Sequence, residues 1–292
     1  MTGGWPIRTA ASVVAALALA GTTQSARAEP AVAPLSVDAP DWVNVTPSPV
    51  ADPSPSYREG DAIAFDDTRG RAVLFGGLGS PYLADTWEWD GSIWIERTVT
   101  PGPVGRAQHA MAHDSARGRV VLFGGYGPPG FLADTWEWDG TRWIERTSTS
   151  RPPARYQHAM AYDRARGRVV LFGGNDGTHF FADTWEWDGN VWVERFSPTS
   201  PSARAGHGMA YDAARGRVVL FQGFSQGAYP GTPERGTWEW DGNVWINRTP
   251  AGGSFPDVIN AYAMAYDRTS ERVLLFGGLK GSSPGFGSQT WT

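Results

Sequence analysis

The stretch RVVLFGGYGPPGFLADTWEWDG, residues 119–140, decides the fold, because close copies of it recur along the chain. Its first part, VLFGG, returns at 73–77 and 170–174, with the variants VLFQG at 219–223 and LLFGG at 274–278. Its last part, DTWEWDG, returns at 85–91 and 183–189, and as GTWEWDG at 236–242. The copies follow one another at intervals of 49, 49 and 53 residues, which indicates five tandem units of about 50 residues.

Each unit has the pattern of four short strands. In the second unit, residues 108–113 alternate between polar and apolar, and residues 114–118 combine an acid with a glycine, which is turn chemistry. An apolar, β-branched run at 119–123 ends at a double glycine. After a Gly- and Pro-rich loop, residues 135–138 lead into Asp-Gly, a strong hairpin signal, and a fourth strand follows at 143–147.

A lone sheet of this kind cannot cover both of its faces, whereas several sheets stacked around an axis can, so the units predict an all-β protein, a β-propeller. The residues resemble the kelch-repeat family: an apolar strand ends in a double glycine, and an aromatic residue precedes a Trp by a fixed spacing. That spacing joins Trp87 to Trp94, Trp136 to Trp143, Trp185 to Trp192 and Trp238 to Trp245. The resemblance covers about residues 41–292 and implies kelch-like, four-stranded blades in a non-catalytic variant of the family.

The chain departs from the kelch pattern in three respects. Trp stands where kelch repeats usually have Tyr, Gln222 replaces one glycine, and kelch propellers more often have six or seven blades than five. The fifth unit lacks a fourth strand, while WVNVTP at 42–47 matches the fourth-strand segment WINRTP at 245–250. We therefore expect the N-terminal strand to complete the last blade and close a five-bladed ring. The alternative is a truncated larger propeller.

Composition excludes several classes of function. The chain has 292 residues, 25 Lys plus Arg against 30 Asp plus Glu, and no Cys. A net charge of -5 disfavours nucleic acid as a partner, and the lack of Cys excludes disulfides, Cys-ligated metals and the cross-linked Tyr of kelch-type copper oxidases. Residues 1–28 have the basic start, apolar run and Ala-Arg-Ala ending of a secretory signal peptide, and 29–40 read as a Pro/Ala-rich linker. We expect a secreted or periplasmic protein whose mature form has no membrane insertion.

An Arg-x-x-His pattern recurs where the chain returns to the first strand of a unit. It joins Arg106 to His109, Arg155 to His158 and Arg204 to His207, and Arg58 is the first, degenerate copy. First strands line the axis of kelch propellers, so these side chains are expected to surround one mouth of the channel and bind an anionic or polar ligand. The alternative is that they tie blades together through backbone carbonyls and turn acids. A three-His metal site is disfavoured by the nearby Arg charge.

The loops between the second and third strands differ between units although their flanks barely do. They read LGSPYLA at 78–84, YGPPGFLA at 126–133 and NDGTHFFA at 175–182, and a longer loop covers 222–236. Variable loops on a rigid scaffold are typical of a binding surface. The candidate ligand-binding residues there are Tyr82, Tyr126, Phe131, His179, Phe180, Phe224 and Tyr229. The alternative is that these rings only pin the loops.

The repeated acids carry no catalytic signal, because equivalent positions have equivalent environments. Glu88, Glu137, Glu186 and Glu239 are expected to pair with an Arg such as Arg119 or Arg168, and the Asp residues that follow each first strand are expected to form turns. We expect a monomeric binding or scaffold module for a protein or a glycan, without a cofactor. The alternatives are a carbohydrate-active hydrolase, lyase or isomerase over the channel, and a structural part of an envelope assembly. An enzyme would need a non-repeated acid–base pair converging in a pocket.

Overall fold

The computed structural model describes residues 53–225, 232–251, 256, 258–280 and 290–292. In that part of the chain the regular elements are all β-strands and no helix is present. Accordingly, none of the described segments is an apolar helix that could cross a membrane. The predicted leader (1–28), linker (29–40) and closing strand (41–47) lie outside the described residues, as does Tyr229.

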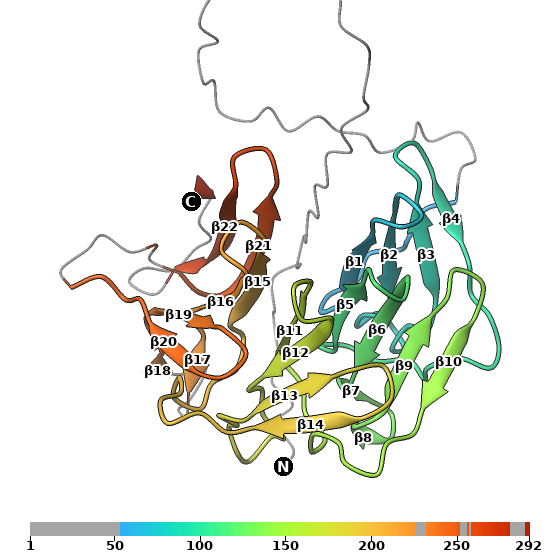
Figure 1. Ribbon diagram of the computed structural model, residues 1–292. Coiled ribbons are helices and arrows are strands. Elements are labelled where there is room, and N and C mark those ends of the chain that lie inside the picture. The colour runs from blue at the N-terminus through green and yellow to red at the C-terminus, as the bar shows by residue number, and fades with distance from the viewer. Residues whose placement is uncertain (1–52, 226–231, 252–255, 257, 281–289) are drawn as a thin grey trace, which may run out of the picture.

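The strands form five antiparallel sheets, which are the blades of a propeller (Figure 1). Blade 1 consists of β1 (Ala62–Asp66), β2 (Arg71–Phe75), β3 (Thr86–Trp89) and β4 (Trp94–Glu96). Blade 2 consists of β5 (Ala110–Asp114), β6 (Arg119–Phe123), β9 (Thr135–Trp138) and β10 (Trp143–Arg146). Blade 3 consists of β11 (Ala159–Asp163), β12 (Arg168–Phe172), β13 (Thr184–Trp187) and β14 (Trp192–Arg195).

Blade 4 consists of β15 (Gly208–Asp212), β16 (Arg217–Phe221), β19 (Thr237–Trp240) and β20 (Trp245–Asn247). Blade 5 has three described strands, β21 (Val258–Asp267), β22 (Arg272–Lys280) and β23 (Thr290–Trp291). The loops of blades 2 and 4 add two-residue hairpins, β7 (Tyr126–Gly127) with β8 (Gly130–Phe131) and β17 (Phe224–Ser225) with β18 (Thr232–Pro233).

The first strand of each blade lies next to the first strand of the following blade, from β1 through β5, β11 and β15 to β21. The strands therefore run outward from the axis in sequence order, and the first strands line the axis. This arrangement confirms the all-β, five-bladed propeller that the repeats predict. Closure by the N-terminal strand concerns residues outside the described part of the chain and stays a prediction.

The hydrophobic core lies between blades rather than within them. Phe75 of blade 1 meets Trp143 of blade 2 edge-on, with ring centroids 5.2 Å apart. The indole nitrogen of Trp143 also donates to the hydroxyl of Thr86 at 2.9 Å, across the same seam. The seams to blades 3 and 4 repeat both contacts through Trp192 and Trp245. A buried indole that both packs and donates explains why Trp dominates the repeat.

The double glycine that ends the second strand of blades 1 to 3 is required by the next blade. Gly124 has φ of 64°, and a Cβ atom there would lie 2.7 Å from the carbonyl oxygen of Arg155. The amide of the following residue, Gly125, donates to that same carbonyl at 2.9 Å. The backbone of one blade thus approaches the next too closely for any side chain.

Candidate functional site

The propeller has two ends along its axis. At the hairpin end, the first strand of each blade turns into the second, as at residues 66–70. At the loop end lie the loops between second and third strands and the returns that carry the predicted Arg residues. The two ends are separated by the length of the first strands, five residues or about 16 Å in blades 1 to 4.

The predicted Arg residues are buried at the loop end and their guanidinium groups are taken up by the protein. Arg106 is 0% exposed and forms a two-pronged pair with Asp134, at 2.6 Å for each nitrogen. It also donates to the carbonyls of Gly124 at 2.9 Å and Val104 at 3.1 Å. Burial alone would raise the pKa of Asp134, but the Arg106 guanidinium outweighs burial and lowers it.

The same contacts recur in blades 1 and 3, where Arg58 pairs with Asp85 and Arg155 pairs with Asp183. In blade 4, Gly236 stands at the equivalent acid position. Arg204 keeps the repeated carbonyl contact, here to Gln222, and donates in addition to the carbonyl of Glu234, whose carboxylate lies 3.7 Å away. These partners are carbonyls and acids at the ends of strands, which is the tying role that the sequence left open as the alternative. All four of these Arg residues are at most 7% exposed.

The predicted His residues form a second repeated set beside the Arg residues. His109 is 6% exposed, meets Phe75 of the preceding blade edge-on at 5.6 Å, and has no hydrogen-bond partner at either ring nitrogen among the described residues. Burial, and then the charge of Arg106, lower its pKa to about 3, so the imidazole is neutral. His158 and His207 have the same surroundings and the same direction of shift. Among the described residues no cluster of three His, Asp or Glu side chains could hold a metal ion.

Four aromatic side chains of the loop end gather into one group, which we call the aromatic platform: Tyr82, Tyr126, Phe131 and Tyr156. Tyr126 lies 5.9 Å from Tyr82 and 5.1 Å from Phe131, and Phe131 stacks on Tyr156 at 5.3 Å with 21° between the rings. Tyr126 and Phe131 are each 39% exposed. The structure therefore brings together three predicted residues from blades 1 and 2 and adds Tyr156, at the entrance to blade 3.

Tyr156 was not singled out from the sequence, although a signal exists. It directly follows a buried Arg, at a position that is Glu59 in blade 1 and Ala107 and Ala205 in blades 2 and 4. Of the other predicted aromatics, Phe180 and Phe224 form a separate pair at 5.9 Å, and the exposed His179 is held by its own turn through Asp176. These three are not part of the platform.

A belt of backbone hydrogen bonds runs round the axis beside the platform. The amide of Gln108 donates to the carbonyl of Gly60 at 2.6 Å, Gln157 to Gln108 at 2.9 Å, and Gly206 to Gln157 at 2.9 Å. All four residues have positive φ, which is 57° at Gln108 and 56° at Gln157. A left-handed backbone costs a residue with a side chain about 1 kcal/mol or more, so two glutamines stand where glycine would be easier. The side-chain oxygen of Gln157, Oε1, accepts from the Asn175 side-chain amide at 3.2 Å.

The hairpin end holds a cavity of about 240 Å³ lined by residues of all five blades. Its walls come mainly from the next-to-last residue of each first strand and from the residue that follows the Asp at the end of that strand. The first set is Phe65, His113, Tyr162, Tyr211 and Tyr266, and the second is Asp67, Ser115, Arg164, Ala213 and Arg268. Both positions vary between blades while their neighbours repeat. This variation is visible in the sequence and could have indicated these residues.

Three tyrosines of this wall strap neighbouring blades together. The hydroxyl of Tyr162 accepts from the amide of Ala116 at 3.3 Å, and Tyr211 and Tyr266 accept equivalent bonds at 3.1 Å from the preceding blade. His113 makes the corresponding contact to blade 1 through two acids. Its Nε2 lies 3.0 Å from Asp66 and its Nδ1 lies 3.1 Å from Asp67.

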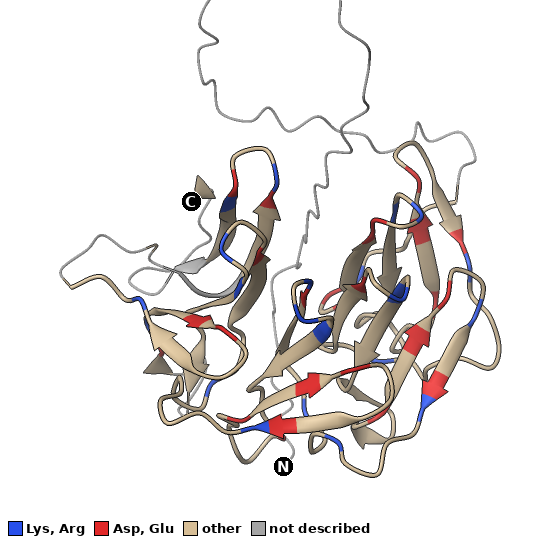
Figure 2. Ribbon diagram, in the orientation of Figure 1, with Lys and Arg blue, Asp and Glu red and all other residues tan. Residues whose placement is uncertain are grey.

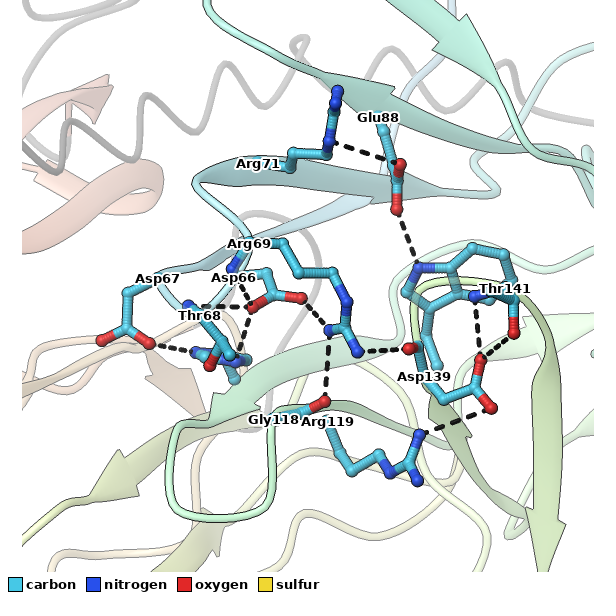
Figure 3. Close-up of polar contacts among 12 residues, drawn as sticks. Asp66, Asp67, Thr68, Arg69, Arg71, Glu88, Gly118, Arg119, Asp139 and Thr141 are labelled. Atoms are coloured by element: carbon cyan, nitrogen blue, oxygen red, sulfur yellow. Dashed lines mark hydrogen bonds and ion pairs between the residues drawn. The ribbon is translucent and has the colours of Figure 1, made fainter.

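Charged groups cluster beside this cavity and in its wall. Burial alone would raise the pKa of Asp66, but His113 and Arg69 outweigh burial and lower it to about 2. Arg69 also reaches from Asp66 to the carbonyls of Gly118 and Asp139 in blade 2, as Figure 3 shows. Asp67 lies 3.1 Å from Arg268 and 3.9 Å from Arg164, which come from blades 5 and 3. Guanidinium groups from blades 3 and 5 thus converge on one carboxylate of blade 1.

The repeated Glu residues are structural, and one of them has a second-strand Arg partner of the expected kind, since Arg71 lies 4.0 Å from Glu88, but in blade 2 the partners are other Arg residues. Acidic bands cross the middle of the third strands (Figure 2), and the one in blade 2 is Glu137, which is 0% exposed. It accepts from Arg117 at 2.6 Å, from Arg146 at 2.8 Å and from the indole of Trp187 in the next blade at 3.0 Å. The expected partner Arg119 lies 3.4 Å from Asp139 instead.

The expected turn role of the Asp residues is confirmed. Asp66 Oδ1 accepts from the backbone amides of Thr68 at 3.1 Å and Arg69 at 3.2 Å, and each later blade has an Asp with a contact of this kind.

Comparison with models of known protein families finds no match, and neither does a search of curated proteins. The kelch likeness therefore rests on the residues of the repeat, and the propeller fold rests on the structure.

Proposed function

We propose that the protein is an exported binding module that holds a glycan on the aromatic platform at its loop end. The proposal depends on one observation: Tyr126, Phe131 and Tyr156 contact one another. The side-chain amides of Gln157 and Asn175 lie beside these rings. Sugar rings present apolar CH faces and a rim of hydroxyls, and they are bound by partly exposed aromatic rings together with fixed amides. The kelch resemblance supports a binding role, and the leader at 1–28 supports export.

The scaffold below the platform favours a preformed site. Phe131 is stacked on Tyr156 on one side and packs against the backbone of Gly177, where a Cβ atom would lie 2.7 Å from the ring. The backbone bonds between Tyr156 and Asn175, both of 3.0 Å, hold the platform to the loop that follows the second strand of blade 3. A ligand would therefore find the rings already ordered, so little side-chain entropy would be lost on binding.

A glycan array on the mature protein, followed by calorimetric titration of the best binder, tests the proposal. We expect Tyr126→Ala and Phe131→Ala each to weaken binding at least tenfold, because each removes a partly exposed ring face. Phe196→Ala is the matched control, since Phe196 is 83% exposed and lies outside the platform. An equal loss in the control, or capture of protein partners alone in a parallel pull-down, would refute glycan binding at the platform.

A carbohydrate-active enzyme is the second candidate, and one observation favours it. His113 between Asp66 and Asp67 is a non-repeated acid–base group at a cavity that all five blades line. Both ring nitrogens, however, face carboxylates, and the His113 side chain is 6% exposed. Binding is therefore the better supported function. Turnover of the bound glycan by the wild type but not by His113→Gln would establish the enzyme instead.

A further inference from the structure

The cavity at the hairpin end is independent of the platform. It lies at the other end of the first strands, and no residue of the platform lines it. One position of its wall changes in charge from blade to blade although its neighbours repeat: it is Asp67 in blade 1, Arg164 in blade 3 and Arg268 in blade 5. A purely structural turn would have no need of such differences, because the repeated turn acid alone ties the backbone.

The geometry points to an anion site: we propose that this cavity binds a small polyhydroxylated carboxylate, of the size of a single sugar acid. Arg164 and Arg268 both approach Asp67 Oδ2, at 3.9 and 3.1 Å, so two positive groups face one carboxylate. Asp67 is also 3.1 Å from His113, which leaves the Arg164 guanidinium without a hydrogen bond among the described residues. Asp267, the other acid of the wall, accepts from Thr269 and Ser270 of its own turn.

Arg164 is placed to take a ligand. Its side chain is 55% exposed, so the head of the side chain remains accessible at the mouth of the cavity. A guanidinium presents donors in a flat fork that matches a carboxylate, and such charge-assisted bonds are about twice as strong as neutral ones. Arg268, 56% exposed, offers a second fork on the same side once it shares Asp67 with the incoming anion.

The rest of the wall selects a small ring with hydroxyl groups. Three tyrosine rings provide apolar faces, and the hydroxyls of Ser115 and Thr269 provide polar contacts. The volume of about 240 Å³ lies below the roughly 300–1,000 Å³ of pockets for drug-sized ligands. A single six-membered ring with one carboxylate therefore fits the size and the charge, whether it is free or ends a polysaccharide.

Calorimetric titration of the mature protein with D-galacturonate, D-galactose, sodium sulfate and a short oligogalacturonate tests the site. We expect galacturonate to bind at least tenfold more tightly than galactose. The oligomer separates the two sources: binding through its end supports the terminal residue of a polysaccharide, whereas binding of the monomer alone supports a free sugar acid. Sulfate binding as tightly as galacturonate would reduce the cavity to a plain anion site and overturn the proposal.

Arg164→Gln is the deciding variant, because Arg164 has no hydrogen bond to the described residues and its ion pair with Asp67, at 3.9 Å, is long and exposed. It should weaken galacturonate binding at least tenfold and leave the melting temperature unchanged. Arg151→Gln is the matched control. Arg151 is an exposed residue on the return between β10 and β11, and the substitution removes the same charge. Equal weakening by both variants, or no binding of any carboxylate by the wild type, would refute the site. Tyr126→Ala should leave galacturonate binding intact, which separates this test from that of the platform.

Discussion

Arg268 in the turn of the last blade donates a hydrogen bond of 3.1 Å to Asp67 in the turn of the first, 201 residues away in sequence. At three other seams the corresponding link is a tyrosine hydroxyl that accepts a backbone amide. Blade 1 has Phe65 at the tyrosine position, so no hydroxyl exists there to reach blade 5. An ion pair thus joins the ends of the described ring where the repeated strap is missing.

Breaking this pair should loosen the seam by a small, salt-dependent amount. Arg268→Gln is expected to cost about 0.2–1 kcal/mol of unfolding free energy, because Arg268 is more than half exposed and exposed pairs are weak. Urea unfolding at low and high NaCl measures the cost, which should shrink as salt screens the pair. A cost that is independent of salt would mean that Arg268 contributes by packing.

Replacing a buried Arg should have a much larger effect. Arg106→Gln leaves the carboxylate of Asp134 without its two-pronged partner, and removal of one member of a buried pair costs about 3–5 kcal/mol. Thermal and urea unfolding of the variant beside Arg164→Gln measure the difference between a buried and an exposed Arg. Similar stability in the two variants would show that Arg106 is free to bind a ligand, as the repeat pattern first suggested.

Acid should destabilise the protein through its buried histidines. The folded pKa of His109 and His207 is about 3, below the ordinary 6.5, so between those values the unfolded chain binds protons that the folded chain refuses. Stability therefore falls as the pH falls below about 6.5. Urea midpoints from pH 7 to pH 4 should decline less steeply for His109→Gln than for the wild type, and parallel curves would contradict a neutral, buried His109.

Asp61 should change stability with pH in the opposite direction, so it serves as the control for that experiment. Burial raises the pKa of Asp61 to about 6. Above that pH the carboxyl is ionised although it is buried, which lowers the stability of the folded protein. Asp61→Asn should raise stability at pH 7–8, by at most about 3 kcal/mol, and the gain should vanish below pH 4. A gain that persists in acid would assign the effect to packing rather than charge.

Gln157→Gly should separate stability from binding. Gly206 shows that glycine suits the same belt position, so removal of the strained side chain is expected to leave stability unchanged or raise it by up to about 1 kcal/mol. The same variant should weaken glycan binding at the loop end, because it removes an amide beside Tyr156. Melting curves and titration on one preparation report both effects. A less stable variant that binds the glycan as well as the wild type would show that Gln157 serves the fold and not the ligand.

Deletion of residues 41–47 tests closure of the ring by the N-terminal strand. The segment matches known fourth strands of this chain, and its loss should lower the melting temperature sharply because blade 5 would lack an outer strand. Deletion of seven residues from the predicted linker at 29–40 is the length-matched control. An unchanged transition in the 41–47 deletion would refute closure by that strand.

The amino-acid sequence by itself determined the fold class, because the information is local and repeated. VLFGG, DTWEWDG and the Asp turns each specify a strand or a turn, and five copies leave few ways to bury their faces. It also pointed to Tyr82, Tyr126 and Phe131, since variable loops on constant flanks are visible without coordinates. The partner Tyr156 was missed because it lies in the next unit.

Only the tertiary structure decided what the charged residues do. Arg106 and Arg164 look equally available in the sequence, yet one is sealed against Asp134 and the other is exposed at a cavity. Burial depends on which segment covers a residue, and here the cover comes from an acid 28 residues away. The hairpin-end cavity depends even more on long-range geometry, because five blades contribute to one wall and no single unit contains the site.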